Sequence, residues 1–311
     1  MANWTFDDIP PQTGRIAIVS GANTGIGYET ARMLAAKGAQ VVLACRNAEK
    51  GAAAAQKINV TGPAKPVTVA PLDLADLESV AAFAAAFQAD HDRLDLLVNN
   101  AGVMVPPLGR TAQGFELQFG TNHLGHFALT GRLLPLLERT PNARVVVVSS
   151  SMQKIGRIDF DDLNWEHRRY AAWQAYAQSK LANMSFALEL ARRLTTAGSE
   201  VRATAAHPGW TATDLARTAG GLGRFFTSRL AMTAQEGALT TLRAATDPAA
   251  EHGGYWGPGR LFGMNGPPVR VRVPPRAKDP EAARRLWAES ERLTGVTFPF
   301  SPDSSGTGRA A

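Results

Sequence analysis

The chain contains very little cysteine and no long apolar run. Its 311 residues include one cysteine, Cys45, so an internal disulfide is excluded and we expect a reducing, cytoplasmic setting. Because Cys45 ends the apolar run 41–45, we expect a buried strand residue rather than a reactive thiol. No stretch of 18 apolar residues is present, so we predict no membrane span. The first 14 residues also lack the basic and apolar regions of a secretory signal.

Concentrated charge is also missing. Lys and Arg outnumber Asp and Glu by 33 to 27, a net charge of +6, but the positive residues are spread thinly and lack interleaved aromatic residues. A nucleic-acid-binding surface would gather them on one face. We therefore expect no nucleic-acid partner and no metal site. We attribute the charge to a solvated surface that also attracts an anionic cofactor.

What the chain does have is a regular alternation of strand-like and helix-like segments. Short Val-rich runs, typical of strands buried on both faces, occur at 16–20, 41–45, 67–72, 94–99, 144–149 and 201–207, with a seventh expected at 256–262. Helix-like segments occur at 26–37, 48–58, 77–88, 113–137, 172–194, 232–245 and 280–293. This alternation predicts an α/β fold, a Rossmann-like doubly wound parallel sheet of seven strands with helices on both faces. We expect a single domain over 1–300, a cover over the site at about 210–232 and a disordered tail at 301–311.

A glycine-rich turn joins the first predicted strand to the first helix. Its candidate cofactor contacts are Gly21, Asn23, Thr24, Gly25, Ile26 and Gly27. Glycine permits a tight turn, and the free N–H groups at the start of the following helix attract phosphate. The glycine spacing differs from the Gly-x-Gly-x-x-Gly dinucleotide fingerprint, and such a turn can also be purely structural. We interpret it as a phosphate site.

The ends of the next two strands carry further cofactor candidates. An NAD-binding unit places an acid after its second strand to bond the ribose, but here Arg46 occupies that position. A guanidinium group suits a 2′-phosphate, which favours NADP(H) over NAD(H); a solvated surface arginine is the alternative. Asp73, followed by Leu74, ends the third strand. Its carboxylate could accept a bond from the adenine amino group or belong to an ordinary turn.

The fourth strand ends in Asn99-Asn-Ala-Gly102. We expect Asn99 to brace the sheet. We expect Asn100, Ala101 and Gly102 to let the backbone approach the cofactor ribose, because this turn follows a strand at the edge where such sheets bind ligands.

A tyrosine and a lysine stand four residues apart in Tyr176-Ala-Gln-Ser-Lys180, within a predicted helix. Residues at this spacing share a helix face, so a phenol and an ammonium group can reach one cleft. A nearby cation lowers the pKa of a tyrosine from its usual value of about 10 and makes it a usable acid or base. An ordinary surface pair is the alternative.

Serine and asparagine supply the remaining polar candidates. Ser149, Ser150 and Ser151 follow the fifth strand, where a hydroxyl could polarise a substrate carbonyl or belong to a turn. Asn122 lies inside the long segment 113–137, although asparagine competes for backbone hydrogen bonds in a helix. It therefore suggests a bend that holds a water, or else a tolerated polar residue.

Taken in order, these motifs and Pro208-Gly209 resemble the short-chain dehydrogenase/reductase family over residues 14–295. Finer features are similar to its retinol dehydrogenase-like branch and the bacterial relatives of that branch. They include Ala44-Cys-Arg-Asn47, Asn122-His-Leu-Gly-His-Phe127, Gly156-Arg-Ile158 and Ala283-Arg-Arg-Leu-Trp287.

The resemblance implies a proton relay of four residues. Tyr176 would be the acid or base, and Lys180 would lower its pKa and bind the nicotinamide ribose. Ser150 would orient the carbonyl oxygen, with Ser151 as the alternative serine. Asn122 would hold the relay water. Further cofactor contacts implied by the resemblance are Tyr176, Lys180, Pro208, Gly209, Thr211 and Thr213.

The substrate region is the most variable part of such a site. Tyr176 lies 26 positions after Ser150, a longer gap than in many family members, and Trp165, Tyr170 and Trp173 in this insert could floor the pocket or simply pack. The expected mouth residues are Trp210, Leu215, Leu222, Phe225, Phe226 and Tyr255. They favour a bulky apolar substrate such as an isoprenoid, steroid, polyketide or aryl ketone.

The sequence therefore predicts an NADP(H)-dependent oxidoreductase that interconverts a small-molecule ketone or aldehyde and its alcohol by hydride transfer. One alternative is C=C reduction, as in the related protochlorophyllide reductases. Another is an NADP(H)-sensing binding protein without turnover. A homo-oligomer is usual in the family, although an extended C-terminal segment can block its interfaces.

Overall fold

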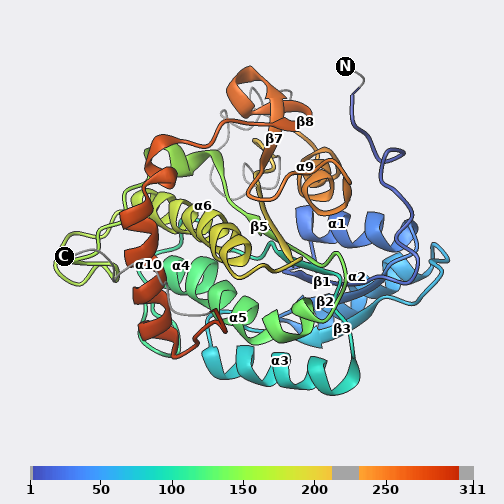
Figure 1. Ribbon diagram of the computed structural model, residues 1–311, viewed down its shortest axis with the longest axis horizontal. Helices are drawn as coiled ribbons and strands as arrows, with labels where there is room; N and C mark the ends of the chain where they lie inside the picture. The colour runs from blue at the N-terminus through green and yellow to red at the C-terminus, as the bar shows by residue number, and fades with distance from the viewer. Residues whose placement is uncertain (1–2, 212–230, 301–311) are drawn as a thin grey trace, which may run out of the picture.

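An eight-stranded sheet forms the centre of the molecule, with helices on both of its faces (Figure 1). The computed structural model describes residues 3–211 and 231–300. Across these residues the strand order is β3-β2-β1-β4-β5-β6-β7-β8. The strands are β1 (Ile16–Ser20), β2 (Gln40–Cys45), β3 (Thr68–Pro71), β4 (Leu96–Asn99), β5 (Arg144–Val148), β6 (Arg202–Ala206), β7 (Tyr255–Arg260) and β8 (Asn265–Arg270). The predicted Rossmann-like, doubly wound α/β fold is confirmed.

The strand count corrects the prediction of seven parallel strands. β1 to β7 are parallel, but β8 is an additional edge strand that pairs antiparallel with β7. Its sequence, Asn265-Gly-Pro-Pro-Val-Arg270, has no apolar alternation, and proline cannot donate to a sheet ladder, so it is tolerated only at an edge. β7 ends at Arg260 because Leu261 and Phe262 take left-handed φ angles of 49° and 57°, which turn the chain back.

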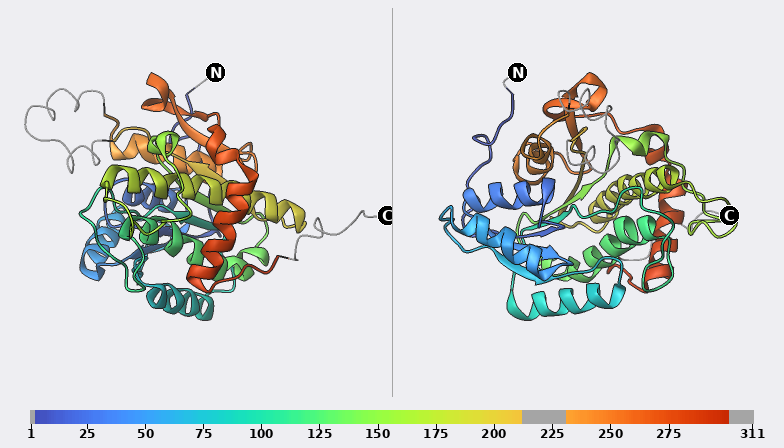
Figure 2. Two further views of the ribbon diagram at one scale, coloured as in Figure 1. Left: turned by 90° about the vertical axis from the view of Figure 1, so that its left-hand side faces the viewer. Right: turned by 180° about the vertical axis from the view of Figure 1, so that it is seen from behind.

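The helices form one layer on each face of the sheet, as the turned views also show (Figure 2). The layer on one face consists of α1 (Gly25–Ala36), α2 (Ala48–Asn59) and α9 (Ala234–Thr246). The layer on the other face consists of α3 (Leu77–Asp90), α5 (Gly125–Glu138) and α6 (Ala172–Thr196). Two apolar cores result, one under each layer.

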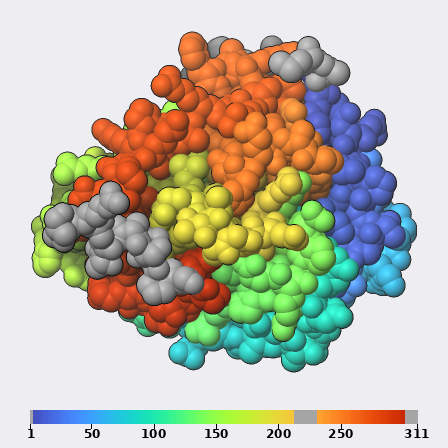
Figure 3. All heavy atoms as spheres, viewed as in Figure 1, coloured from blue at the N-terminus to red at the C-terminus, as the bar shows by residue number. Residues whose placement is uncertain are grey.

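The last helix, α10 (Pro280–Thr294), packs on the outside of α6, where its residues flank those of α6 in the space-filling view (Figure 3). It begins as predicted, because the Asp279 carboxylate accepts hydrogen bonds from the N–H groups of Glu281 and Ala282. The segment after it returns to the core: the Phe298 ring lies 4.6 Å from Trp287 and 4.9 Å from Phe127, measured between ring centroids. Burying such a ring stabilises the fold by about 2 kcal/mol.

The long predicted helix 113–137 contains a π-helical turn where the sequence suggested a bend. A short α4 (Leu117–Phe119) passes into a π-helical turn, η1 (Gly120–Leu124), which contains Asn122 and leads directly into α5. The helix starts later than predicted because the buried Glu116 carboxylate accepts hydrogen bonds from Gln118 N and Phe119 N and so caps it. Single π turns occur often at functional sites.

Two smaller predictions can also be checked. Cys45 is buried at the end of β2, and burial raises the pKa of its thiol, as expected for a core residue. No helix among residues 3–211 and 231–300 has the length and apolar character needed to cross a bilayer. Most of the expected cover and the tail at 301–311 lie outside the described residues, and so do five candidate residues: Thr213, Leu215, Leu222, Phe225 and Phe226.

Candidate active site

The glycine turn between β1 and α1 leaves no room for side chains. Gly21 and Gly25 adopt φ angles of 67° and 60°, which favour glycine. A Cβ atom on Gly27 would lie 2.6 Å from the carbonyl oxygen of Gly21, so the turn closes only with glycine there. Thr24 is the N-cap residue of α1, and its side chain makes no capping hydrogen bond to the first turn. This exposed helix start fits a phosphate group.

A buried serine connects this turn to the end of β4. The Ser20 hydroxyl oxygen accepts hydrogen bonds from Asn100 N at 2.9 Å and Ala101 N at 3.0 Å. The side-chain amide of Asn100 donates in return to the Ser20 carbonyl at 2.8 Å. β1 and β4 are the neighbours at which the strand order reverses, the point where doubly wound sheets bind ligands. Ser20 thus fixes the geometry of that crevice.

Tyr176 and Lys180 lie together on α6 and line one small cavity, of about 100 Å³. Both side chains are more than nine-tenths buried. Lys180 Nζ donates to the Val148 carbonyl at 3.2 Å and lies 5.7 Å from the centre of the Tyr176 ring. A Cβ atom on Gly102 would approach Lys180 Nζ to 3.5 Å, so the turn after β4 forms the opposite wall.

The three serines after β5 have different surroundings. The Ser149 hydroxyl donates to the Lys180 carbonyl at 2.7 Å, which commits it to holding α6 against β5. Ser150 precedes the 3₁₀ helix η2 (Ser151–Ile155), and its hydroxyl oxygen accepts from Met152 N at 3.3 Å while its proton remains available. Ser149 and Ser150 line the cavity, and Ser151 is not among the described residues that do. The geometry favours Ser150 over Ser151.

The Asn122 side chain is buried behind the cavity. Its Oδ1 accepts from Val103 N at 2.8 Å, and its Nδ2 donates to the Val103 carbonyl and the Ser179 hydroxyl, both at 3.0 Å. Both amide hydrogens are therefore used, so a water bound to Asn122 would have to donate to one of its oxygens, either the second lone pair of Oδ1 or the main-chain carbonyl. That carbonyl lies 2.9 Å from His126 Nδ1 and keeps a second lone pair.

His126 joins the two halves of the site. It is fully buried, and burial lowers its pKa to about 4, with the charge of Lys180 acting in the same direction. The imidazole is therefore neutral at neutral pH. Because the Asn122 carbonyl can only accept, Nδ1 carries the proton, and Nε2, at 2.9 Å from the Ser20 hydroxyl, can accept from it. The sequence analysis missed both Ser20 and His126; the only signal was a histidine four residues after Asn122.

Comparison with known proteins agrees with this geometry. Residues 15–221 match the short chain dehydrogenase family. The chain belongs to this family. Human retinol dehydrogenase 13 is 44% identical over 296 residues, which cover 92% of this chain and 86% of that protein. Mouse polyprenol dehydrogenase is 42% identical over 300 residues, which cover 93% of this chain and 86% of that protein. The resemblance to the retinol dehydrogenase-like branch is thereby confirmed.

Solved structures show the same fold. A crystal structure of an uncharacterized protein from Mycobacterium paratuberculosis has a TM-score of 0.82 at 45% identity and covers 96% of this chain and 100% of that one. The RhlG/NADP active-site complex of Pseudomonas aeruginosa has a TM-score of 0.62 at 26% identity. The match covers 79% of this chain and 96% of that one. This short-chain dehydrogenase is therefore an oxidoreductase of a family that binds a nicotinamide cofactor.

Eight candidate residues of this short-chain dehydrogenase gather at one place. Those that line the cavity are Ile26, Asn100, Gly102, Ser150, Tyr176, Lys180, Pro208 and Gly209. Val103 and Met104 line it as well, which the sequence analysis did not anticipate. Arg46 is exposed immediately after β2, and Asp73 follows β3 with its Oδ1 accepting from Ala75 N at 2.9 Å. No three His, Cys, Asp or Glu residues in the described part of the chain gather as metal ligands.

Several candidates lie away from the cavity. Leu74 is buried against the start of α5, and Asn99 is buried with its amide donating to the Thr130 hydroxyl at 2.8 Å, which fits a structural role. Trp210 N donates to the Met264 carbonyl at 2.9 Å. Thr211 is buried and forms a parallel bridge with Met232.

The prediction that Tyr255 lines the pocket mouth is wrong. Tyr255 is 2% exposed in β7, and its hydroxyl accepts a hydrogen bond from Gln153 Nε2 at 2.9 Å, so it packs in the core beneath the site. In the insert between Ser150 and Tyr176, Trp165 is likewise buried, whereas Trp173, in the first turn of α6, is 47% exposed.

Proposed function

We propose that this chain is an NADP(H)-dependent oxidoreductase that interconverts a ketone or aldehyde and the corresponding alcohol. The observation that carries the proposal is the single cavity shared by Ser150, Tyr176 and Lys180. It lies beside the Asn100–Gly102 turn and at the carboxyl ends of β4 and β5, where such sheets bind ligands.

Each cavity residue has a task in this reaction. Reduction of a carbonyl adds a hydride to carbon and a proton to oxygen, and oxidation reverses both transfers. When bound, the nicotinamide supplies or accepts the hydride. Tyr176 gives the proton to the carbonyl oxygen or takes it back, because its hydroxyl shares the cavity with the Lys180 ammonium group, which favours the phenolate. The Ser150 hydroxyl donates to the same oxygen and orients it.

Lys180 and Asn122 complete the proton path. The Lys180 ammonium group is held by the Val148 carbonyl, so it stays in place beside Tyr176. The main-chain carbonyl of Asn122, fixed by the π turn and by His126, holds the water that passes protons between Lys180 and solvent.

The cofactor preference rests on the end of β2. Arg46 is exposed there, and neither Cys45 nor Asn47 beside it carries a carboxylate that would bond a ribose hydroxyl. A guanidinium group gives a bidentate grip on a 2′-phosphate. The remaining proposed contacts are the glycine turn, Asp73 with Leu74, the turn after β4, and the residues Pro208, Gly209, Thr211 and Thr213. The similar RhlG structure is a complex with NADP, which supports this preference.

The substrate class follows from the cavity wall and from the relatives. Ile26, Val103 and Met104 give the cavity apolar edges, and two relatives carry the names of retinol and polyprenol, both of them bulky apolar alcohols. We therefore propose a substrate with a bulky apolar body.

Replacing Tyr176 tests the mechanism. Tyr176→Phe removes only the hydroxyl that transfers the proton, so we expect kcat for NADPH-dependent reduction of an aldehyde or ketone panel to fall by about 10²- to 10⁴-fold. Tyr170→Phe is the matched control, because Tyr170 OH bonds the Glu116 carboxylate outside the cavity; we expect it to keep most of its rate. A Tyr176→Phe protein with normal turnover would refute this role.

Replacing Arg46 tests the cofactor preference. Arg46→Asp puts a carboxylate where the 2′-phosphate would lie, so we expect KM for NADPH to rise at least tenfold while KM for NADH changes little or falls. Steady-state kinetics with both cofactors measures this. Because Arg46 is exposed, the variant should fold normally. An equal change for both cofactors would remove Arg46 from the phosphate site.

A further inference from the structure

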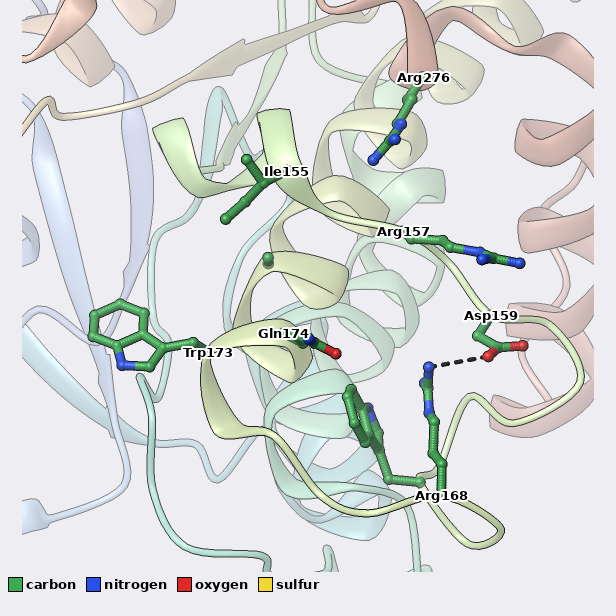
Figure 4. Close-up of a pocket in the computed structure, with 9 residues that line it drawn as sticks. Ile155, Arg157, Asp159, Arg168, Trp173, Gln174 and Arg276 are labelled. Carbon is green, nitrogen blue, oxygen red and sulfur yellow. Dashed lines mark hydrogen bonds and ion pairs between the residues drawn. The ribbon is translucent and has the colours of Figure 1, made fainter.

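A second cavity, of about 440 Å³, lies beside the first turns of α6 (Figure 4). We refer to it as the outer cavity. Its walls come from the segment after η2, from the insert before α6 and from α6 itself, and Arg276 of the 3₁₀ helix η4 (Pro275–Lys278) adds a fourth side. None of the residues assigned to proton transfer lines it. Its volume lies in the range of sites that hold small organic molecules.

The outer cavity carries an excess of positive charge. Arg157, Arg168 and Arg276 line it together with a single carboxylate, Asp159. Arg168 is already neutralised, because it forms ion pairs with Asp159 at 3.0 Å (Figure 4) and with Asp162 at 3.3 Å. Its guanidinium group also stacks on Trp165.

The guanidinium groups of Arg157 and Arg276 can still donate hydrogen bonds to a ligand. Arg276 spends one N–H on the Gly156 carbonyl at 2.9 Å. Arg157 makes no hydrogen bond or ion pair with any residue in the described ranges, and none of its five donors is committed. Two guanidinium groups on one cavity suit a carboxylate or phosphate group, which they can bind through charge-assisted, bidentate hydrogen bonds.

Apart from Gln174, the remaining residues that line the outer cavity are apolar. Ile155 and Trp173 are 68% and 47% exposed, although large apolar side chains are usually covered. Trp165 forms a buried wall. The φ angle of Trp165 is 58°, a strained conformation of the kind that often accompanies ligand sites. The matching ligand has an apolar body and an anionic end.

The outer cavity and the catalytic cavity are lined by neighbouring residues of the same two elements, α6 and η2. Trp173 and Ala177 line the outer cavity, and they stand three residues before and one residue after Tyr176 in the same helix. η2 likewise connects Ser150, on the catalytic cavity, with Ile155, on the outer one. Five residues of 3₁₀ helix span about 10 Å, so one extended molecule can bridge two cavities that lie at the two ends of η2.

We propose that the outer cavity binds the anionic end of the substrate, a carboxylate or a phosphate, while the carbonyl at the other end of its apolar body reacts at Tyr176. This inference rests on the proposed function. It narrows the substrate class to amphipathic oxo compounds whose two polar ends are separated by an extended apolar body.

The proposal is tested with the intact protein, NADPH and three series of compounds of increasing chain length. The series are ω-oxo carboxylates, their methyl esters and the corresponding ω-oxo alkyl phosphates. We expect an optimum chain length and a KM at least tenfold lower for the anions than for esters of equal length. Arg157→Gln should raise KM for the anions about tenfold, leave kcat nearly unchanged and leave the esters unaffected. The better of the two anion series identifies the anionic group.

Arg139→Gln is the matched control, because Arg139 is an exposed arginine after the last residue of α5, outside the outer cavity. Two outcomes would overturn the inference. One is an equal KM for esters and anions of the same length, and the other is an equal kinetic effect of Arg157→Gln and Arg139→Gln. Calorimetric binding of a saturated fatty acid, which has no carbonyl to reduce, separates the two proposals. Binding that is lost in Arg157→Gln, with no turnover of any oxo compound, would refute the proposed function and leave the anion site supported. Saturated-acid binding that survives in Arg157→Gln would overturn the anion site.

Discussion

His126 shows how a single side chain can organise a site without touching its cavity. Its two ring nitrogens lie 2.9 Å from the Asn122 carbonyl and 2.9 Å from the Ser20 hydroxyl. Through Ser20 it reaches the N–H groups of Asn100 and Ala101, and through Asn122 it reaches the π turn. His126 is therefore a positioning residue between the cofactor side and the proton-transfer side.

Two variants of His126 separate these connections. His126→Leu removes the imidazole that bonds the Asn122 carbonyl and is one of the partners of the Ser20 hydroxyl, so we expect a loss of about 1–3 kcal/mol of stability and a higher KM for NADPH. His126→Asn can still donate to the Asn122 carbonyl one turn earlier, so we expect it to recover kcat while KM for NADPH stays raised. Urea denaturation and steady-state kinetics measure both quantities. Equal kcat losses in the two variants would show that the bond to Asn122 does not matter.

The residues that sequence analysis could find differ from those it missed in a physical respect. Tyr176 and Lys180 are four positions apart, so helix geometry alone brings them together. Ser20 and His126 are 106 positions apart and meet only when β1 and α5 pack. Tyr255 was wrongly placed at the pocket mouth because the sequence does not show that Gln153, 102 positions earlier, bonds its hydroxyl inside the core.

At the scale of elements, periodicity predicted most strands and helices because parallel strands buried on both faces give continuous apolar runs. β8 was not predicted, because an edge strand with Pro267 and Pro268 has neither a continuous apolar run nor an alternation of apolar and polar residues. For the insert between Ser150 and Tyr176, the sequence indicated only that its aromatic residues could floor the pocket or simply pack. The outer cavity could not be foreseen, since it requires Arg157, Arg168 and Arg276 from three separate segments to converge.

At the scale of the whole molecule, buried histidines make stability depend on pH. Burial lowers the pKa of His123 to about 3 and the pKa values of His126 and His207 to about 4. In the unfolded chain these groups take up protons near pH 6.5. Between pH 6.5 and 4 the unfolded state therefore binds more protons, and the free energy of unfolding falls as the pH falls.

We expect this free energy to be nearly constant from pH 8 to 7 and then to decrease by about 1.4 kcal/mol per pH unit for each buried histidine below pH 6.5. Urea denaturation at pH 7, 6 and 5 measures the slope. His123→Gln removes one of the three groups and should reduce the slope by about a third. A decrease that starts only below pH 4 would instead point to carboxylates such as Asp162, whose pKa is lowered from 3.8.

The π turn η1 also changes how this chain must be compared with other helical sequences. A π turn holds one more residue than the α-helical turn it replaces, so side chains before Gly120 and after Leu124 differ in phase by about 100° from those of an unbroken helix. A helical apolar pattern fitted to the whole segment 113–137 therefore combines two apolar faces that point in different directions, one before the π turn and one after it. An alignment with a protein whose helix lacks the turn must open a one-residue gap between Gly120 and Leu124. Without that gap, Asn122 is matched to a residue on the wrong side of the helix.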